Sequence, residues 1–288
     1  MKDGYLNIIM IKSLQKQLIA SIKTKDHSQI RILRNVINKL KTLQINKGSE
    51  LDDNECLKAI QSMTKQIRDS ISQFKIANRD DLVAIETEEL QFLETLLPKQ
   101  LSKEEINYLP LRYFNGKIHI IQTANQAADG CKILIKEKIL GFDTETRPAF
   151  NKGQSYLPSL LQLAGSKVVY LFQLSKCGLT DELISILSNI NIIKSGVAID
   201  QDLIELQKIL HFEPKGFIDI GKIARSKGFP HHGLRGLTAY LLNFRISKSG
   251  STSNWSANQL TKRQIKYAAT DAWIGRELYL EYKRTNII

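Results

Sequence analysis

Cysteine, proline and long apolar runs are all scarce in this sequence, and each absence excludes a class of protein. The chain of 288 residues has three cysteines and no CxxC pair. We therefore expect neither a zinc site nor a disulfide framework, and a reducing cytoplasm is the simplest location. No apolar run approaches the roughly 20 residues of a membrane span. Lys12 and Lys16 interrupt the apolar N-terminal segment, which has no small-residue cleavage site after it, so we expect no signal peptide and no membrane partner.

Proline is absent from the first third of the chain, because the first one is Pro98. Residues 12–98 have the pattern of helices. Apolar residues recur at spacings of three and four in 27–45 and 54–76, and less regularly in 80–97. This spacing predicts amphipathic helices that pack their apolar sides together. We expect a small all-α bundle here.

The helix ends of this first part are also marked in the sequence. Gly48 is predicted to end one helix, and Asp52 or Asp53 to cap the next one. His27 is the only histidine of this part, and we interpret it as a capping or surface residue at a helix start. Nothing here has the pattern of a catalytic site.

The net charge of +12 comes from 41 Lys and Arg residues against 29 Asp and Glu residues. Residues 1–101 hold 16 basic and 13 acidic residues, and the remainder holds 25 basic and 16 acidic residues. Most of the excess therefore lies in the second part of the chain. A basic surface favours a polyanionic partner such as nucleic acid, and a lysine-rich solvated surface is the alternative interpretation.

The pattern changes after residue 107, where prolines begin to recur and the apolar runs become short. Strands followed by alternating helices and strands predict an α/β sheet with helices packed on it. We place the boundary between two domains near residues 101–110, which gives domains 1–103 and 104–288. The predicted strands are 117–122, 139–143, 159–165, 167–174 and 191–199, and the predicted helices are 180–189, 202–210, 219–227, 233–243 and 261–283.

Two carboxylates end the first strong strand of the second part, in the stretch ILGFDTET. Asp143 and Glu145 are two residues apart, so both side chains lie on one face of the strand. The residues before them are apolar on both faces, which predicts a central strand. Two like charges repel unless a cation neutralises them, and Mg²⁺ or Mn²⁺ prefers oxygen ligands. The alternative is a solvated strand end.

Further acids lie in two later stretches. GVAIDQDLIEL places Asp200 and Asp202 where a strand leads into a helix, and for Asp200 we favour a helix-capping role. YAATDAWIGRELY places Tyr267 and Asp271 four residues apart on a predicted helix, so they share a face. The helix is otherwise apolar there, which predicts that this face packs on the sheet. An exposed tyrosine and aspartate are the alternative.

FDTET, GVAIDQDLIEL and YAATDAWIGRELY, in this order, resemble the three exonuclease motifs of the DnaQ-like (ribonuclease H-like) superfamily. The Tyr-x-x-x-Asp pattern and the Ser253-Asn254-Trp255 triplet are similar to its ribonuclease D and Werner-type branch. This resemblance covers residues 105–284 and implies a mixed sheet flanked by helices. It further implies a hydrolase, a 3′–5′ exonuclease that uses two Mg²⁺ or Mn²⁺ ions and releases 5′-mononucleotides from a single-stranded 3′ end of RNA or DNA.

Position by position, the resemblance implies four metal ligands, which are Asp143, Glu145, Asp202 and Asp271. Tyr267 matches the residue that orients the attacking water. Basic and aromatic side chains grip single strands in general. The candidates for that contact are Arg147, Phe150, Lys152, Lys248, Trp255, Arg263 and Lys266. Packing in the core is the alternative for Trp255, and we interpret Asp219 as structural.

The first part of the chain resembles the helical domain of the GatB/YqeY family, from KDHSQIRILRNVINKLK to the segment that ends in LLPKQLS. This resemblance implies a tRNA-related or protein-docking role and carries over no catalytic residue. The segment LSKEEI suits the end of one family and the start of the other, which indicates a fusion. A binding adaptor for nucleic acid or tRNA, without catalysis, is the alternative function for the whole chain.

Overall fold

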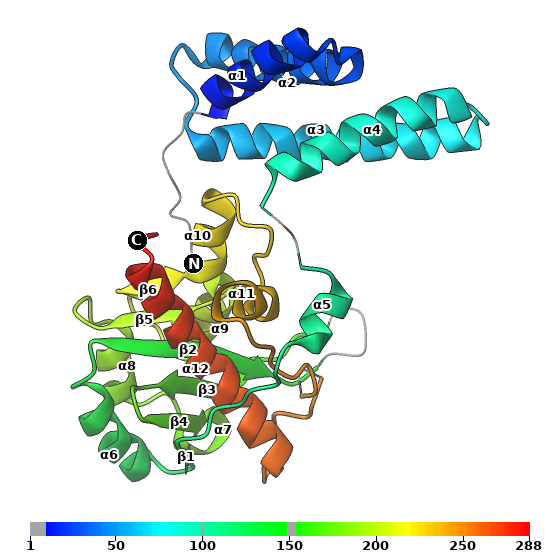
Figure 1. The fold of residues 1–288 in the computed structure, drawn as a ribbon. Coiled ribbons are helices and arrows are strands. Elements are labelled where there is room, and N and C mark those ends of the chain that lie inside the picture. Colours follow the sequence, from blue (N-terminus) through cyan, green and yellow to red (C-terminus); the bar gives the residue numbers. More distant parts are fainter. Residues whose placement is uncertain (1–9, 99–100, 149–153, 251) are drawn as a thin grey trace. The chain divides into compact units, whose positions relative to one another are not determined.

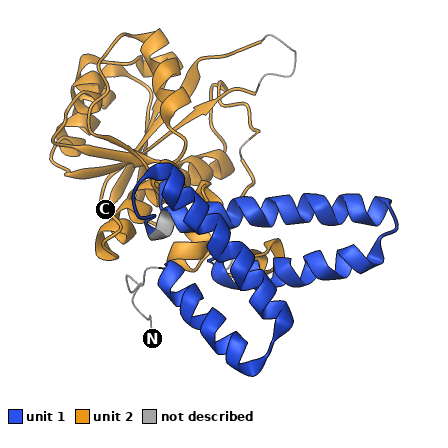
Figure 2. Ribbon diagram, turned by 90° about the horizontal axis from the view of Figure 1, so that it is seen from above, with its two compact units in different colours: residues 1–100, 226–230 blue, residues 101–225, 231–288 orange. Residues whose placement is uncertain are grey.

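The computed structural model describes residues 10–98, 101–148, 154–250 and 252–288. The chain divides into two compact units (Figures 1 and 2). Unit 1 comprises residues 1–100 and 226–230, and unit 2 comprises residues 101–225 and 231–288. Within the described part, no helix combines the length and the apolar character that crossing a membrane requires.

Unit 1 is built from two helical hairpins (Figure 1), which confirms the predicted all-α bundle. The apolar stripes of its helices form one core, whose centre includes Leu14, Leu33, Leu40, Ile60 and Leu93. The helices are α1 (Met10–Thr24), α2 (His27–Lys47), α3 (Asp53–Ile76) and α4 (Asp80–Leu96).

The predicted helix ends of unit 1 are also confirmed. Gly48 ends α2 in the left-handed conformation, with φ of 73°. Asp52 begins α3 with a reciprocal capping box, in which its side chain and that of Glu55 each accept a backbone N–H. Asp26 caps α2 by accepting from the backbone of Gln29, so His27 is an exposed first residue of the helix and not its cap.

Unit 2 contains a six-stranded mixed sheet with the strand order β1-β4-β3-β2-β5-β6. Strands β2, β3 and β4 are antiparallel neighbours, whereas the pairs β1–β4, β2–β5 and β5–β6 are parallel. This is the predicted mixed sheet. The strands are β1 (Lys117–Ile121), β2 (Ile139–Thr146), β3 (Pro158–Ala164), β4 (Val168–Gln173), β5 (Ile193–Gly196) and β6 (Phe217–Asp219).

Helices cover both faces of this sheet. On one face, Ala268, Ala269 and Ala272 of α12 pack against Leu160 and Leu171 of the sheet, and α12 crosses the strands in Figure 1. On the other face, α6 and α8 pack against the opposite side chains of β2, β3 and β4. The helices are α5 (Lys103–Tyr108), α6 (Ala124–Leu134), α7 (Leu174–Cys177), α8 (Asp181–Leu187), α9 (Asp200–Ile209), α10 (Ile220–Ser226), α11 (Leu234–Leu242) and α12 (Lys262–Arg284).

The structure differs from the predicted elements of unit 2 at several elements. Helix α6 has no counterpart in the prediction, because its buried side consists of the small residues Ala127, Gly130 and Cys131 with a single leucine, Leu134. Strand β6 and the short helices α5 and α7 are likewise additional. Strand β5 is shorter than the predicted 191–199, and the chain leaves the extended conformation at Ala198, with φ of 61°.

Candidate active site

Strand β2 places two carboxylates on the face of the sheet that α12 covers. It lies between β3 and β5, so it is a central strand as predicted. Gly141 precedes Asp143 on the same face, and a Cβ atom there would lie 1.8 Å from the backbone oxygen of Ala272. The missing side chain therefore lets α12 lie directly on β2. This close approach brings Asp271, the neighbour of Ala272, to the acidic end of the strand.

Three carboxylates form one cluster at this end of β2. Asp143, Glu145 and Asp271 each offer an oxygen, and these oxygens lie within 4.8 Å of one another. Glu145 is 9% exposed and Asp271 is 7% exposed, while Asp143 is half-buried. One oxygen of Asp271, Oδ1, is buried and has no hydrogen-bond partner among the described residues.

Burial and mutual repulsion disfavour the ionised forms of these acids. Burial raises the pKa of Asp143 well above its ordinary value, and the charges of Asp271 and Asp202 raise it further. The pKa of Glu145 is raised by burial and then by the charge of Asp143. Burial also raises the pKa of Asp271, although a hydrogen bond with Tyr267 and the charge of Arg235 lower it. A cation within the cluster would reverse this balance.

Asp202 lies near the cluster and is held from the other face of β2. It belongs to the first turn of α9, and the hydroxyl of Thr144 donates to its Oδ1 at 2.5 Å. Burial raises the pKa of Asp202, whereas the hydrogen bond from Thr144 lowers it. Because Asp202 contributes to the raised pKa of both Asp143 and Glu145, the fold brings all four predicted acids into one electrostatic group.

The neighbouring acids have other roles. Asp200 does not cap α9, so that prediction is wrong, because the capping position is Ile199 and Asp200 is already inside the helix. Its exposed carboxylate pairs with Lys222 at 2.5 Å. Asp219 is structural, as predicted, since it accepts the backbone N–H groups of Ile199 and Lys222.

Tyr267 lies one helical turn before Asp271 and is partly buried. Burial, followed by the charges of Asp271 and Glu145, raises the pKa of its hydroxyl above the ordinary value. The hydroxyl therefore stays protonated at neutral pH. Beside three carboxylates, such a group can donate and accept hydrogen bonds but does not act as a free base.

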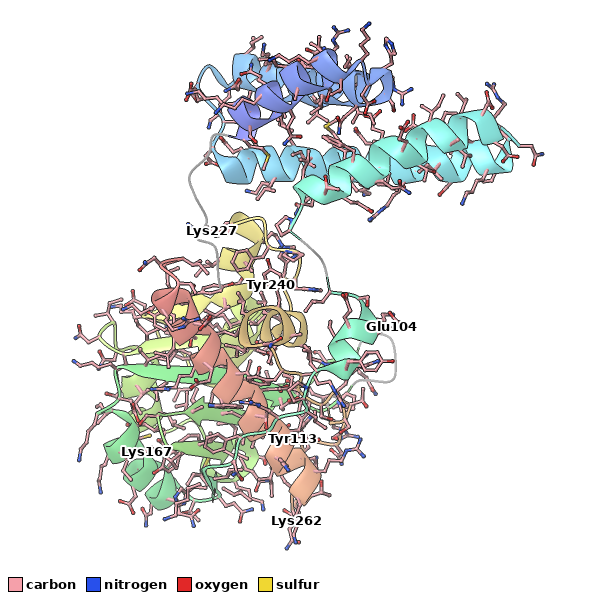
Figure 3. All side chains as sticks on the ribbon, viewed as in Figure 1. Glu104, Tyr113, Lys167, Lys227, Tyr240 and Lys262 are labelled. Carbon is pink, nitrogen blue, oxygen red and sulfur yellow. The ribbon has the colours of Figure 1, made fainter. Side chains whose placement is uncertain are left out.

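The candidates for nucleic-acid contact come from three segments of the sequence, around residues 147–152, 248–255 and 263–266. Arg147, Lys248, Arg263 and Lys266 are exposed, and Arg147 follows Glu145 by two residues. Arg263 donates to the backbone oxygen of Ser249 at 3.2 Å. The ammonium of Lys266 lies 4.0 Å over the ring of Tyr113, which is beside α12 in Figure 3.

Three of the predicted contacts do not appear in that set. Phe150 and Lys152 lie outside the described residues. Stacking of a base on Trp255 is wrong, because the indole is 1% exposed and belongs to the core between α12 and the sheet. The alternative interpretation of Trp255, packing in the core, is the one that the structure supports.

Three side chains at the site had no place in the sequence prediction. Thr144 supports Asp202, and the positive charge of Arg235 acts on Asp271. Gln162 lies opposite Asp143 on β3, so the two side chains share a face. It is fully buried, and neither polar atom of its amide has a partner among the described residues. The only sequence signal for Gln162 is a polar residue within the otherwise apolar run SLLQLA.

The donor set fits a hard divalent cation. Mg²⁺ and Mn²⁺ bind carboxylate oxygens and water, and a hydrated ion can satisfy polar groups that the protein leaves without partners. Here the acids are crowded and buried, and the free oxygen of Asp271 offers such an unsatisfied acceptor. Among the described residues, no other group of three potential ligands is this close together.

Comparison with known proteins identifies the family of each part of the chain. Residues 118–284, more than half of the chain, match the family described as 3'-5' exonuclease. Residues 11–112 match the family described as Yqey-like protein. Among solved structures, the Nibbler EXO domain of Aedes aegypti superposes with a TM-score of 0.55 at 24% identity, covering 61% of this chain and 91% of that one.

Curated relatives each align with about three fifths of this chain. The bifunctional 3'-5' exonuclease/ATP-dependent helicase WRN of Mus musculus is 32% identical over 185 residues, and a 3'-5' exonuclease of Arabidopsis thaliana is 27% identical over 195 residues. Ribonuclease D of Haemophilus influenzae is 28% identical over 196 residues. These alignments cover 59%, 62% and 62% of this chain, and 13%, 68% and 48% of the relatives. The chain thus spans less than half the length of two of these relatives. It belongs to the 3'-5' exonuclease family and has a YqeY-like domain at its N-terminus.

Proposed function

We propose that this protein is a metal-dependent 3′–5′ exonuclease that hydrolyses phosphodiester bonds of nucleic acid and releases 5′-mononucleotides. The observation that carries the proposal is the buried cluster of Asp143, Glu145 and Asp271, whose oxygens lie within 4.8 Å of one another. Such a cluster costs free energy without a cation, so a purely structural role does not explain it. Membership of the 3'-5' exonuclease family supports the same reaction.

In this proposal, Asp143, Glu145 and Asp271 hold the divalent ions, Mg²⁺ or Mn²⁺, and Asp202 completes the set. Two bound ions of this kind lower the pKa of a water molecule and neutralise charge on the phosphodiester. Thr144 fixes the orientation of Asp202 through its 2.5 Å hydrogen bond. Tyr267 aligns the attacking water through its protonated hydroxyl.

The substrate in this proposal is a single-stranded 3′ end of RNA or DNA. Residues 102–288 hold 25 basic and 16 acidic residues, which favours a polyanion. Arg147 follows Glu145 by two residues in the sequence, and the charge of Arg235 lowers the pKa of Asp271. We assign them to phosphate contact, together with Lys248, Arg263 and Lys266.

For the first 103 residues we propose a docking role, and residues 104–288 form the catalytic domain. The residues of unit 1 offer no comparable acid cluster within the described part, so this unit does not supply the reaction. The YqeY-like match supports docking of tRNA, other nucleic acid or a protein. We further propose that the protein acts in the cytoplasm.

The test is a trimming assay with a 5′-labelled single-stranded oligonucleotide of RNA or DNA. In Mg²⁺ or Mn²⁺, the chain should shorten the strand from its 3′ end, and mass spectrometry should identify 5′-mononucleotides. EDTA should stop the reaction. Asp143→Asn should do the same, whereas Asp200→Asn, an isosteric change of an exposed acid in the same unit, should retain activity. Binding of the strand without any metal-dependent trimming would support the adaptor function instead.

A further inference from the structure

Unit 1 carries its charge unevenly between its two hairpins. The segment 10–47, which forms α1 and α2, holds nine Lys and Arg residues and one acidic residue, Asp26. The segment 53–96, which forms α3 and α4, holds five basic and nine acidic residues. The positively charged α1–α2 hairpin attracts polyanions, whereas the negatively charged α3–α4 hairpin repels them.

The basic residues of the first hairpin are mostly left without acidic partners. Arg31 pairs with Glu88 at 3.5 Å, and Lys47 pairs with Glu55 at 2.6 Å. No ion pair among the described residues involves Lys39 or Lys41, and both are exposed. Two acids of α4 pair within their own hairpin, Glu94 with Arg68 at 2.6 Å and Asp81 with Arg79 at 2.7 Å. The positive charge of α2 is therefore available to an external ligand.

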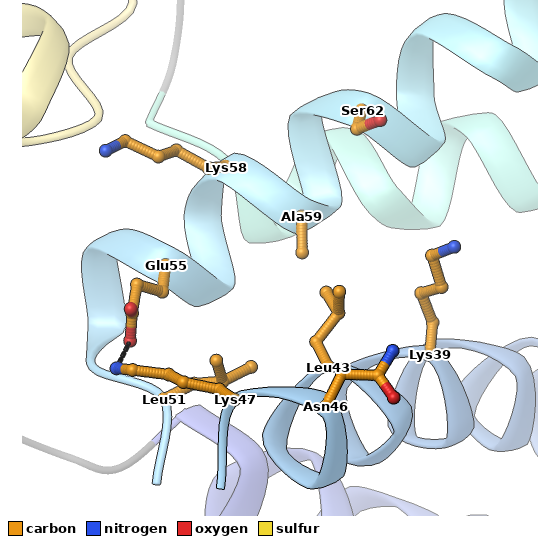
Figure 4. Close-up of a pocket in the computed structure, with 9 residues that line it drawn as sticks. All are labelled: Lys39, Leu43, Asn46, Lys47, Leu51, Glu55, Lys58, Ala59 and Ser62. Atoms are coloured by element: carbon orange, nitrogen blue, oxygen red, sulfur yellow. Dashed lines mark hydrogen bonds and ion pairs between the residues drawn. The ribbon is translucent and has the colours of Figure 1, made fainter. Parts of the chain in front are cut away.

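A pocket of about 570 Å³ lies between α2 and α3, and three lysines and one acid are among its lining residues (Figure 4). Leu43, Leu51 and Ala59 contribute apolar surface to it. Ser62 also lines it, and the Lys47–Glu55 ion pair closes one end. The remaining lining residues are Lys39, Asn46 and Lys58, so the pocket combines an apolar lining, one amide and two further lysines.

This combination matches the parts of a nucleotide. Apolar side chains accept the face of an unstacked base, an Asn amide can donate to and accept from a base edge, and lysines bind phosphate. A volume of this size is that of a small-ligand site. A helix of a partner protein would need an apolar stripe along several turns, whereas here lysines flank a short apolar patch.

We infer that the α2–α3 pocket binds one nucleotide of a single-stranded nucleic acid, with its base on Leu43, Leu51 and Ala59 and its phosphates at Lys39 and Lys58. The inference rests on the proposed function only in taking nucleic acid as the partner. According to this inference, the YqeY-like unit binds the strand at a specific pocket and not through its net positive charge alone.

The test measures binding of a fluorescein-labelled single-stranded RNA or DNA 20-mer to the full chain by anisotropy, in EDTA so that no metal-dependent cleavage occurs. The variant Lys39→Gln/Lys58→Gln is compared with Lys41→Gln/Lys75→Gln. Both pairs remove one exposed lysine from α2 and one from α3, and Lys75 lies about 25 Å along α3 from Lys58. The net charge changes equally, so only the location differs.

The pocket variant, Lys39→Gln/Lys58→Gln, should bind the strand with an affinity lower on the order of tenfold. The slope of its log affinity against log salt concentration should become shallower by about 1.4. In the control variant, Lys41→Gln/Lys75→Gln, the affinity and the salt slope should equal those of the parent chain within error. Equal effects of the two pairs, or no effect of the pocket pair, would overturn the inference.

Two further variants test the apolar part and the amide. Ala59→Leu fills the pocket and should lower affinity on the order of tenfold without changing the salt slope, because it removes base contact and no charge. Asn46→Ala lies on an exposed position, so it tests the site without disturbing the core, and unchanged affinity in both variants contradicts the assignment of the base. Trimming by the parent chain together with unchanged binding by the pocket variants would overturn only this inference. Loss of binding in those variants, with no trimming by the parent, would support it and contradict the proposed exonuclease.

Discussion

The two units differ in what satisfies their buried polar side chains. In unit 1, Ser21 and Thr64 are buried, and each donates to a carbonyl of its own helix, at 3.1 Å to Gln17 and at 2.8 Å to Ile60. In unit 2, Glu145 and Asp271 are buried beside each other. Local hydrogen bonds make the first pair inexpensive to bury, whereas the second pair repels.

This difference indicates that unit 1 is a packed scaffold, whereas the buried acids of unit 2 form a ligand-binding site. Buried like charges persist only where something outside the protein offsets their cost. Unit 1 keeps its charges on the surface, so its function has to be sought in an exposed pocket. Unit 2 keeps acids inside, so its function is expected at the acids themselves. The following predictions test that contrast.

The largest effect is expected from Asp271→Asn in unit 2. The substitution removes one carboxylate of the proposed metal site. Loss of a group that only orients a metal ligand lowers activity by up to about 100-fold. Loss of the ligand itself should therefore lower the trimming rate by more than that. It also removes a repelling charge, so the free energy of unfolding in EDTA should rise by about 1 kcal/mol. Trimming assays and urea unfolding measure the two effects. Activity close to that of the parent chain would remove Asp271 from the site.

Thr144→Val should weaken metal binding by about 10- to 100-fold, as for other groups that orient a ligand. Valine retains the shape of the buried side chain and lacks the hydroxyl that donates to Asp202 at 2.5 Å. Calorimetric titration with Mn²⁺ measures the change, and Thr144→Ser should restore affinity. Thr64→Val, which removes a buried hydroxyl from unit 1, is the matched control and should leave the affinity unchanged. A similar loss in both variants would show that the effect is not local.

Without metal, the stability of unit 2 should fall as pH rises above about 4, the ordinary pKa of carboxyl groups. The pKa values of Asp143, Glu145 and Asp271 are raised in the folded state, so the unfolded chain releases its protons first. The stabilisation is complete below the unfolded pKa and is lost as pH rises through the folded values. The slope is about 1.4 kcal/mol per pH unit for each group concerned.

Tryptophan fluorescence isolates this effect, because both tryptophans of the chain, Trp255 and Trp273, lie in unit 2. Urea unfolding followed by that signal should give a lower free energy at pH 7 than at pH 5 in EDTA. Mn²⁺ should reverse the trend, since metal binding displaces protons from the acids. Stability that rises with pH in EDTA would contradict the raised pKa values.

The sequence predicts most of unit 1, because each helix carries its own apolar stripe and its own end signals. Gly48 and Asp52 act within a few residues of their position, so local rules suffice for them. Helix α6 shows where such rules fail. Its buried face is made of alanine, glycine and cysteine, which become a core face only because Tyr170 of the neighbouring strand packs there, 2.9 Å from where a Cβ of Gly130 would lie.

The candidate site divides in the same way. Asp143 and Glu145 follow from the alternation of one strand, and Tyr267 and Asp271 follow from one helical turn. That these pairs meet depends on Gly141, whose role is visible only with α12 on top of it. Thr144, Gln162 and Arg235 contribute through neighbours that are distant in the sequence, so no local pattern marks them. The capping role predicted for Asp200 is wrong because helix α9 begins at Asp200 and not at residue 202.

The smallest effect is expected in unit 1, from Gly48→Ala. The residue adopts φ of 73°, and the space where a Cβ would lie is empty, so the cost is backbone strain alone, about 1 kcal/mol. Far-UV circular dichroism should report earlier urea unfolding of helices, whereas tryptophan fluorescence from unit 2 and trimming of a short oligonucleotide should stay unchanged. Gly48→Asn should cost less, because asparagine tolerates this conformation better. An equal shift of the tryptophan unfolding transition would mean that the two units unfold together as one cooperative body. The two units would then differ in their chemical roles but not in their stabilities.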